Sequence, residues 1–398
     1  MHASSSFRRS SLGVAVGLAL ASAVIIAAPA TANAPGDLSV TFAAEDIEKS
    51  AVSTDGATIA LSGESDDTVT LIRTATNTAV TVADPDTDFS GPGGVVFSLD
   101  GATLYLANYQ GGNLIVIDVA TATITEVIEN AEFDGPWVLD ISSTGDTLYI
   151  GDYNDDEVYF FDIDTSTVTD VIDVSAQTGD VYGLYTSADG SQVFAVDDDG
   201  SIDVVDVATA ALVDSWTDIV IGSSYGPCVS PDGSTLYQPD RNNAALYSSS
   251  LSTGAVLASN AATVQPQGSE HTTCAVSPDG SSVFLSHYDA LNPGSITEYD
   301  ATTLAYVATY DFPAIEYTQQ IVFFSDCQAY VVGYNGDAQT FDLDCAAAPV
   351  DPDPELAATG PDSAAVTGMA ALAGGVVLLG VLAVWIRGRR VAGARSAG

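Results

Sequence analysis

Four residues in the second half of the chain could support acid–base chemistry: Arg241, Glu270, His271 and His287. A histidine can move a proton near neutral pH, a carboxylate can orient it, and an arginine can stabilise developing negative charge. The sequence contains no GxSxG, HExxH or glycine-rich phosphate motif. We therefore take these four residues as the catalytic candidates, and we expect a binding protein rather than an enzyme.

A second set of residues could bind a ligand at a shared surface. The sequence contains seven repeats, described below, and the last residue of the second strand of each repeat is expected on the same face of the ring that they form. Five of these seven residues are polar or charged. Aromatic residues stand at the entry to several first strands. Carboxylates beside aromatic rings suit the recognition of sugars or cations. The predicted ligand-binding mouth consists of Asn108, Asp152, Asp197, Asp240, Trp137, Tyr182 and Tyr225. The alternative is that Asp and Asn cap turns and that the aromatic residues fill gaps between repeats.

Runs of aspartate raise the question of calcium. Asp152, Asn154 and Asp156 match the opening of an EF-hand loop, but Glu157 stands where that loop needs glycine. Asp197 to Asp199 form a similarly partial match. The metal ligands therefore stay unassigned, and calcium is the one cofactor that the carboxylate content favours.

A repeated turn motif defines the fold class. Ser-x-Asp-Gly, or a near variant, follows an apolar run at Ser53, Ser98, Ser142, Ser187, Ser230 and Ser277, with a degenerate seventh copy at Ser325. The turn glycines are 43 to 47 residues apart, and each turn leads into an alternating strand. A period in the forties with several short strands is typical of a propeller blade. We predict an all-β, seven-bladed β-propeller over residues 33–345; two separate β-sandwiches would not need equal spacing.

The last repeat ends after its third strand. The strand-like segment from Leu38 to Ala43 is available to complete that blade, which would close the ring without an exposed edge. A recurring Asp-x-x-Thr motif after each third strand, as at Asp118 and Asp162, indicates turn capping.

The repeats resemble the YVTN family of seven-bladed propellers, whose units contain SPDG, YVxN and D-x-x-T. Ser230 to Gly233, Ser277 to Gly280, Tyr105 to Asn108 and Asp118 to Thr121 carry the resemblance. It implies the propeller fold, whereas related propellers include lactonases, surface-layer components and binding proteins. Three hypotheses for function follow: a non-catalytic ligand- or partner-binding surface protein, a secreted lactonase-like hydrolase, and a structural surface-layer component. We favour the first, because catalytic motifs are scarce.

All four cysteines lie in the last half of the chain. Cys228 and Cys274 occupy the first strands of successive blades, while Cys327 and Cys345 occupy two turns at the same end of the last blade. The predicted disulfides are Cys228 with Cys274 and Cys327 with Cys345, in an oxidising compartment. A zinc site is the alternative, but the sequence lacks CxxC spacing.

The charge distribution excludes one class of partner. Between Asn33 and Thr359 the chain has three basic residues and 52 acidic ones, a net charge of −49. Such a surface repels phosphate backbones, so we expect no nucleic-acid binding.

The N-terminal residues predict export. Arg8 and Arg9 precede an apolar stretch and then Ala30-Thr31-Ala32, the order of a secretory signal peptide over residues 1–32. An N-terminal membrane anchor is the alternative.

The C-terminal residues predict attachment to a cell wall. Residues 346–355 form a Pro/Asp spacer, 356–360 read Leu-Ala-Ala-Thr-Gly, 364–386 are an uncharged transmembrane helix, and 387–398 are a basic cytoplasmic tail. This order resembles the LPxTG sorting signal of Gram-positive sortase substrates, in the LAxTG variant of actinobacteria. The resemblance implies cleavage between Thr359 and Gly360, with sortase and peptidoglycan as partners besides an extracellular ligand or protein. The expected location is the extracellular cell wall, with membrane attachment only before sorting; a permanent single-pass protein is the alternative.

Overall fold

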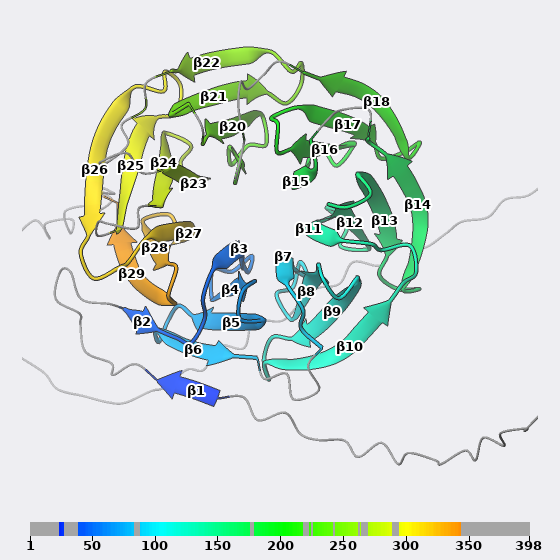
Figure 1. Ribbon diagram of the computed structural model, residues 1–398, viewed down its shortest axis with the longest axis horizontal. Helices are drawn as coiled ribbons and strands as arrows, with labels where there is room; N and C mark the ends of the chain where they lie inside the picture. The colour runs from blue at the N-terminus through cyan, green and yellow to red at the C-terminus, as the bar shows by residue number, and fades with distance from the viewer. Residues whose placement is uncertain are drawn as a thin grey trace, which may run out of the picture. The chain divides into compact units, whose positions relative to one another are not determined.

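Each sequence repeat forms one antiparallel sheet in the computed structural model, and the sheets are arranged around a central axis (Figure 1). The structure describes residues 24–27, 39–82, 88–175, 179–217, 223, 226–241, 243–261, 263, 270–288 and 294–343. The predicted all-β, seven-bladed propeller is confirmed.

The strands of blades one to four follow one another in the chain. Blade one contains β3 (Ile47–Val52), β4 (Thr58–Gly63), β5 (Thr68–Arg73) and β6 (Thr78–Thr81). Blade two contains β7 (Pro92–Phe97), β8 (Thr103–Asn108), β9 (Asn113–Asp118) and β10 (Thr123–Glu129). Blade three contains β11 (Pro136–Ile141), β12 (Thr147–Asp152), β13 (Glu157–Asp162) and β14 (Thr167–Asp173). Blade four contains β15 (Val181–Thr186), β16 (Gln192–Asp197), β17 (Ile202–Asp206) and β18 (Ala211–Trp216).

Blades five to seven complete the ring. Blade five contains β19 (Cys228–Val229), β20 (Thr235–Asp240), β21 (Ala245–Ser250) and β22 (Val256–Asn260). Blade six contains β23 (Glu270–Val276), β24 (Ser282–Tyr288), β25 (Gly294–Asp300) and β26 (Tyr306–Phe312). Blade seven contains β27 (Thr318–Ser325), β28 (Gln328–Gly333), β29 (Asp337–Asp342) and, from the other end of the chain, β2 (Val40–Thr41).

The repeated Ser-x-Asp-Gly motif closes the turn between the first and second strands. In blade four, the Ser187 hydroxyl donates to Asp189 Oδ1 at 2.8 Å and accepts from the amide of Gln192 at 3.0 Å. Gly190 has φ = 71°, a left-handed conformation that favours glycine. Hydrogen bonds from Ser191 and Ser187 lower the pKa of Asp189 to about 2. The side chains of the serine and the aspartate therefore form hydrogen bonds within the turn itself. This structural role explains why the motif recurs from blade to blade, and it does not require these residues to bind a ligand.

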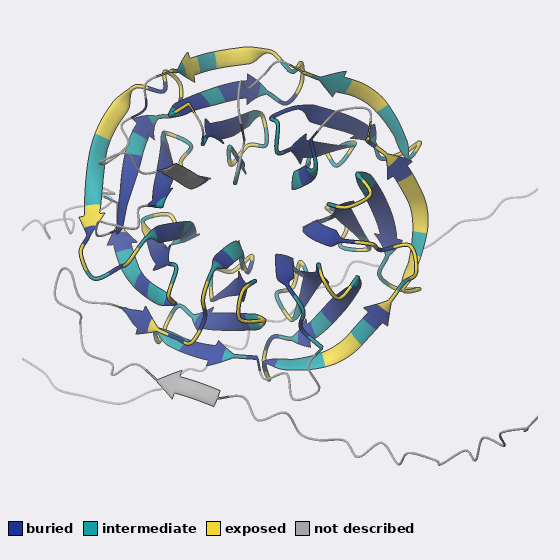
Figure 2. Cartoon of the chain, viewed as in Figure 1, coloured by how far each residue is buried: buried dark blue, intermediate teal, exposed yellow. Residues whose placement is uncertain are grey.

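The hydrophobic core lies between adjacent blades. Tyr149 and Phe160 of blade three pack with Val193 and Val205 of blade four, for example. Figure 2 shows the inner strands buried and the outer strands partly exposed. Burial of both faces of each sheet explains why the second and third strands read as nearly continuous apolar runs.

The N-terminal strand closes the ring as predicted. β2 pairs antiparallel with β29, with Val40 opposite Ala338 and Thr41 opposite Asp337. The amide of Phe42 then donates to the carbonyl of Gly336 at 3.0 Å. Blade seven thus combines β2 with the last three strands of the described chain and has a paired outer strand.

Blade one carries one strand more than predicted. β1 (Val24–Ala27) pairs antiparallel with β6, from Val24 opposite Thr81 to Ala27 opposite Thr78. This segment falls inside the predicted signal peptide. Its removal by cleavage after Ala32 would leave β6 as the outer strand of blade one.

Most of the predicted signals at the chain ends lie outside the described residues. These include the spacer, the sorting motif with Thr359 and Gly360, the transmembrane helix and the basic tail. Within the described part of the chain, no helix has the length and apolar character needed to cross a membrane.

The predicted disulfide between Cys228 and Cys274 is confirmed. It joins the first strands of blades five and six, with a Cα–Cα distance of 5.6 Å. Cys327 is also disulfide-bonded, and Cys345, its predicted partner, lies outside the described residues. The zinc alternative for Cys228 and Cys274 is therefore wrong.

We predict that the double substitution Cys228→Ser/Cys274→Ser lowers the free energy of unfolding by about 4 kcal/mol. The chain-entropy model gives this value for a crosslink between residues 46 positions apart. Urea unfolding monitored by tryptophan fluorescence would measure the change against the oxidised wild type. An unchanged transition midpoint would show that the crosslink contributes nothing to stability.

Candidate functional site

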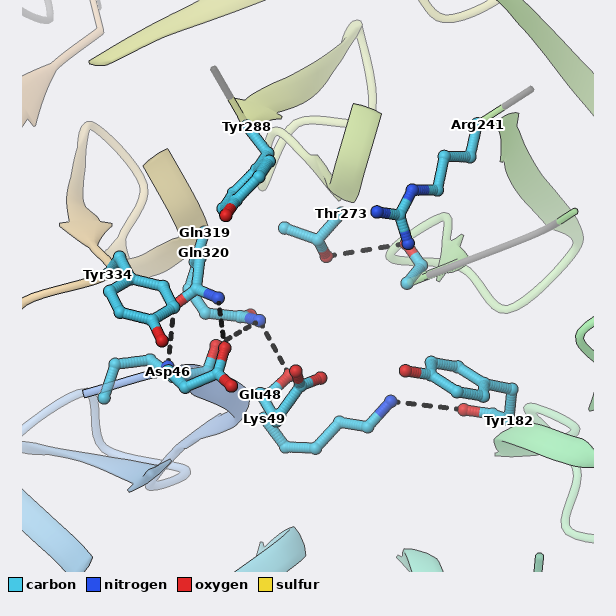
Figure 3. Close-up of a pocket in the computed structure, with 12 residues that line it drawn as sticks. Asp46, Glu48, Lys49, Tyr182, Arg241, Thr273, Tyr288, Gln319, Gln320 and Tyr334 are labelled. Carbon is cyan, nitrogen blue, oxygen red and sulfur yellow. Dashed lines mark hydrogen bonds between the residues drawn. The ribbon is translucent and has the colours of Figure 1, made fainter. Parts of the chain in front are cut away.

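A cavity of about 300 Å³ lies where the first strands of several blades meet (Figure 3). We call it the mouth cavity. Its lining consists of Asp46, Ile47, Glu48, Lys49, Tyr182, Gly226, Arg241, Thr273, Tyr288, Gln319, Gln320 and Tyr334. The volume is at the lower end of the range for small-ligand sites.

Two glutamines of blade seven fix the acidic side of this cavity. Gln319 donates from Nε2 to Asp46 Oδ1 at 2.9 Å and accepts at Oε1 from the amide of Ile47 at 2.6 Å. Gln320 donates to the carbonyl of Glu48 at 2.9 Å. The start of β3 is therefore held by β27, and closure of the ring brings the acidic segment into the cavity (Figure 3).

Lys49 is the only lysine of the chain, and it reaches across the mouth cavity. Its Nζ donates to the carbonyl of Tyr182 at 3.3 Å. The same atom lies 4.2 Å from the ring centroid of Tyr182 and 5.3 Å from that of Trp137. Cation–π attraction therefore links blade one to blades three and four.

Burial perturbs two ionisable groups of the cavity. It raises the pKa of Glu48 to about 7, while Lys49 and Arg241 act in the opposite direction. It also lowers the pKa of Lys49 to about 8, against the attraction of Glu48 and Glu64. Burial thus disfavours the charged form of both groups, a perturbation that is common at binding and proton-transfer sites.

A second hollow of about 200 Å³ adjoins the first and shares Tyr182 with it. We call it the aromatic pocket; its lining consists of Glu64, Tyr109, Trp137, Tyr153 and Tyr182. The rings pack edge to face or tilted, with Tyr109 and Trp137 centroids 5.4 Å apart and Trp137 and Tyr182 centroids 5.8 Å apart. Together the two hollows offer charged groups and a continuous aromatic wall.

The residues expected at the entry to the first strands lie where the sequence placed them. Tyr182 lines both hollows, and Trp137 lines the aromatic pocket with 5% of its surface exposed. Tyr225, the third aromatic residue of this series, lies outside the described residues.

The residues expected at the ends of the second strands are buried. Asn108, Asp152 and Asp240 have no exposed surface, and Asp197 has 1%. Asn108 Oδ1 accepts from the amide of Ser90 at 2.7 Å, and Asp152 accepts from the amide of Gly135. Asn108 and Asp152 therefore hold the segment that leads into the first strand of their own blade, and they do not face a ligand.

The residue that follows each of these positions faces the hollows instead. In six of the seven blades this next residue is a lining residue: Glu64, Tyr109, Tyr153, Arg241, Tyr288 and Tyr334. Successive side chains of a strand point to opposite faces, so a shift by one residue exchanges the buried set for the exposed one. Several of these residues are tyrosines, and this recurrence of aromatic residues directly after the second strands is the feature of the sequence that could have identified them.

The catalytic candidates are not all brought to one surface. His287 is 2% exposed, and its Nε2 lies 2.8 Å from Thr297 Oγ1. This candidate catalytic histidine is therefore buried against a neighbouring strand of its own blade and does not line the mouth cavity. Arg241 lines the mouth cavity. Glu270 and His271 are described in backbone only, where His271 pairs with His287.

Comparisons with known proteins bear on the fold. No family model matches the chain, and no curated protein does. The chain is similar to a solved chain of "Kuenenia stuttgartiensis Hydrazine Synthase", with a TM-score of 0.64, 16% identity, and coverage of 76% of this chain and 97% of that one. It is also similar to a chain of the "Mitotic Checkpoint Complex", with a TM-score of 0.61, 15% identity, and coverage of 80% and 94%. These similarities show the propeller fold alone, and the resemblance to the YVTN family stays a prediction.

We predict that Lys49 reacts with amine-directed reagents at a much lower pH than an ordinary lysine. Its lowered pKa, about 8, supplies the neutral amine needed for acylation. Peptide mapping by mass spectrometry after treatment with an N-hydroxysuccinimide ester between pH 6 and 10 would give the titration midpoint. Since the chain has no second lysine, Lys49→Arg is a blank for side-chain labelling. A midpoint above pH 10 would contradict the burial argument.

Proposed function

We propose that this protein is an exported, cell-wall-anchored propeller that binds a small ligand in the mouth cavity without transforming it. The observation that carries the proposal is the distribution of positive charge. Of the three basic residues between Asn33 and Thr359, Lys49 and Arg241 both line this one cavity.

The charge balance of the cavity favours a zwitterionic ligand. Lys49 and Arg241 can bind a carboxylate, while Asp46 and Glu48, which lie beside Lys49 and across the cavity from Arg241, can accept from an ammonium group (Figure 3). The chain as a whole has a net charge of −44, so a simple anion would be repelled before it reached the cavity. A ligand that carries both charges avoids this penalty.

The tyrosines of the cavity indicate which uncharged parts the ligand has. Tyr182, Tyr288 and Tyr334 present ring faces and hydroxyl groups to the cavity, and the aromatic pocket continues from Tyr182. Such walls suit the flat faces of sugar rings and the side chains of short peptides. Amino acids, amino sugars and short peptides with free ends therefore form the expected ligand class.

A lactonase-like hydrolase is the second candidate, and the pKa of Glu48 is the observation that favours it. A carboxyl group with a pKa of about 7 can act as a general base on water. If the cavity hydrolyses lactones or esters, Glu48→Gln will abolish turnover. The purely structural surface-layer role requires only the ring and the anchor.

We predict that Arg241→Gln weakens binding of a zwitterionic ligand by tenfold or more, because a charge-assisted hydrogen bond is worth about 1.5–3 kcal/mol. Isothermal titration calorimetry would first identify a ligand from a panel of amino acids, amino sugars and peptidoglycan fragments. The variant would then be titrated with that ligand.

Arg73→Gln is the matched control for this measurement. It removes the same charge from blade one, where Arg73 donates to Thr58 Oγ1 and to the carbonyl of Val119 and does not line the cavity. Equal losses in both variants would show that overall charge, not the cavity, governs binding. A panel with no binder would contradict the proposed ligand class.

The anchoring proposal rests on the sorting-like motif and on the spacer, helix and basic tail around it. We predict that muramidase digestion releases the protein with peptidoglycan fragments attached, and that Thr359→Ala shifts it to the membrane fraction. Cell fractionation and immunoblotting would measure both. Recovery of intact wild-type protein by detergent alone would rule out covalent attachment.

A further inference from the structure

A groove of about 820 Å³ lies between blades six and seven, and we call it the blade six–seven groove. None of its lining residues belongs to the mouth cavity or to the aromatic pocket. Blade six contributes residues of the turn from Ser277 to Ser282 together with Glu298 and Tyr310, and blade seven contributes Asp326, Phe341, Asp342 and Leu343. The groove is therefore a separate surface, and its ligand need not be the ligand of the mouth cavity.

The groove opens where the outer strand of blade seven is short. β2 has two residues, whereas the outer strands of the other six blades have four to seven. β2 pairs only with the start of β29 (Figure 1), and Ser39 Oγ extends this contact by accepting from the amide of Thr340 at 2.9 Å. Among the described residues, no strand lies outside Phe341 and Asp342, the two residues of β29 that line the groove.

Aromatic rings of both blades line the groove. Tyr310 of β26 and Phe341 of β29 pack edge to face, with ring centroids 4.8 Å apart. Leu343 packs against the same hydrophobic cluster. Phe341 is 8% exposed, whereas Tyr310 and Leu343 are half-buried. The groove therefore offers apolar surface that an occupant can bury.

Four carboxylates lie around these apolar residues, those of Asp279, Glu298, Asp326 and Asp342. The half-buried Glu298 is the one held by two hydroxyl groups: Oε1 accepts from Ser282 and Oε2 from Tyr310, each at 2.6 Å. Both bonds leave lone pairs of the carboxylate available to a further donor. Glu298 is thus fixed next to the ring of Tyr310, where an apolar contact and an ionic contact can be made together.

The negative charge of the groove is not balanced by a basic residue within it. None of the three basic residues of the described chain lines the groove, and two of them, Lys49 and Arg241, line the mouth cavity. A hydrogen bond from the Ser277 hydroxyl lowers the pKa of Asp279, so this carboxylate keeps its charge at neutral pH. A concave surface with carboxylates and no counter-charge attracts cationic partners.

We propose that the blade six–seven groove binds an extended peptide segment of a partner protein that combines arginine or lysine with apolar residues. Its cationic side chains pair with the carboxylates, and its apolar side chains cover the rings of Tyr310 and Phe341. An extended main chain is the conformation that fits beside the uncovered end of β29, because a strand added there continues the sheet of blade seven.

The test is fluorescence anisotropy with the purified full-length protein and a fluorescein-labelled peptide in which arginine alternates with valine. The buffer contains about 0.15 M sodium chloride, which screens diffuse attraction to the acidic surface beyond about 8 Å. We expect saturable binding, and binding about tenfold weaker or less for the peptide in which glutamate replaces arginine. Spermidine should compete poorly, since it offers the charges without the apolar and main-chain contacts.

Two variants assign the binding to the groove. Glu298→Gln should weaken peptide binding about tenfold, because it removes a charge-assisted hydrogen bond at a half-buried carboxylate. The new amide oxygen can still accept from a hydroxyl group, so the blade should fold. Asp342→Asn should weaken binding only about threefold, because Asp342 is exposed and exposed ion pairs contribute less.

Two matched controls make the same chemical changes on other blades. Glu126→Gln on β10 and Asp170→Asn on β14 alter exposed carboxylates of outer strands that do not line the groove. Each should change the peptide affinity by less than about twofold. A benzophenone group at the centre of the peptide should crosslink to β26 or β29, as peptide mapping by mass spectrometry would show.

Several outcomes would overturn the proposal. Equal losses in the groove variants and the controls would show that net charge attracts the peptide. Crosslinks to the mouth cavity, equal binding of the glutamate peptide, or competition by spermidine as strong as that of the unlabelled peptide would exclude a basic peptide in this groove, as would the absence of binding. If Glu298→Gln does not fold, the exposed Asp342→Asn carries the same comparison.

Discussion

The pairing of β2 with β29 is the interaction on which the rest of the molecule depends. A ring of sheets has its full core only when the last blade packs against the first, and here a two-residue strand from the N-terminal side completes the last blade. The same segment continues directly into Asp46, Glu48 and Lys49. Gln319 and Gln320 of blade seven bind this segment where blade seven meets blade one, a contact that we call the seam. Closure of the ring therefore also builds the mouth cavity.

The sequence predicted the architecture well because the turns encode it locally. A serine and an aspartate that bond to each other and to the following amides produce the same turn wherever they occur, as the Ser187–Asp189 pair illustrates. The repeat alignment also placed Cys228 and Cys274 in equivalent strands, which was sufficient to predict their disulfide.

The site was harder to predict, because a functional surface depends on side-chain direction. The alignment selected Asn108, Asp152 and Asp240, which are fully buried, and missed Tyr109 and Tyr153, each one position later. Register shifts in the first strands, such as those between Pro136 and Val138 and between Val181 and Gly183, bring residues such as Trp137 and Tyr182 to their positions near the axis. Bulges of this kind follow from the three-dimensional packing and leave no clear mark in composition or period.

The position of β29 also determines how the ring responds to mechanical force. β29 is an interior strand, bonded to β28 along one edge and to β2 along the other. A pull on the chain beyond Leu343 therefore loads two hydrogen-bond ladders in shear at once, instead of peeling an edge strand away bond by bond. Tension applied from that end is therefore resisted by the blade that closes the ring. The strand pairing that completes the fold also gives this blade its mechanical resistance.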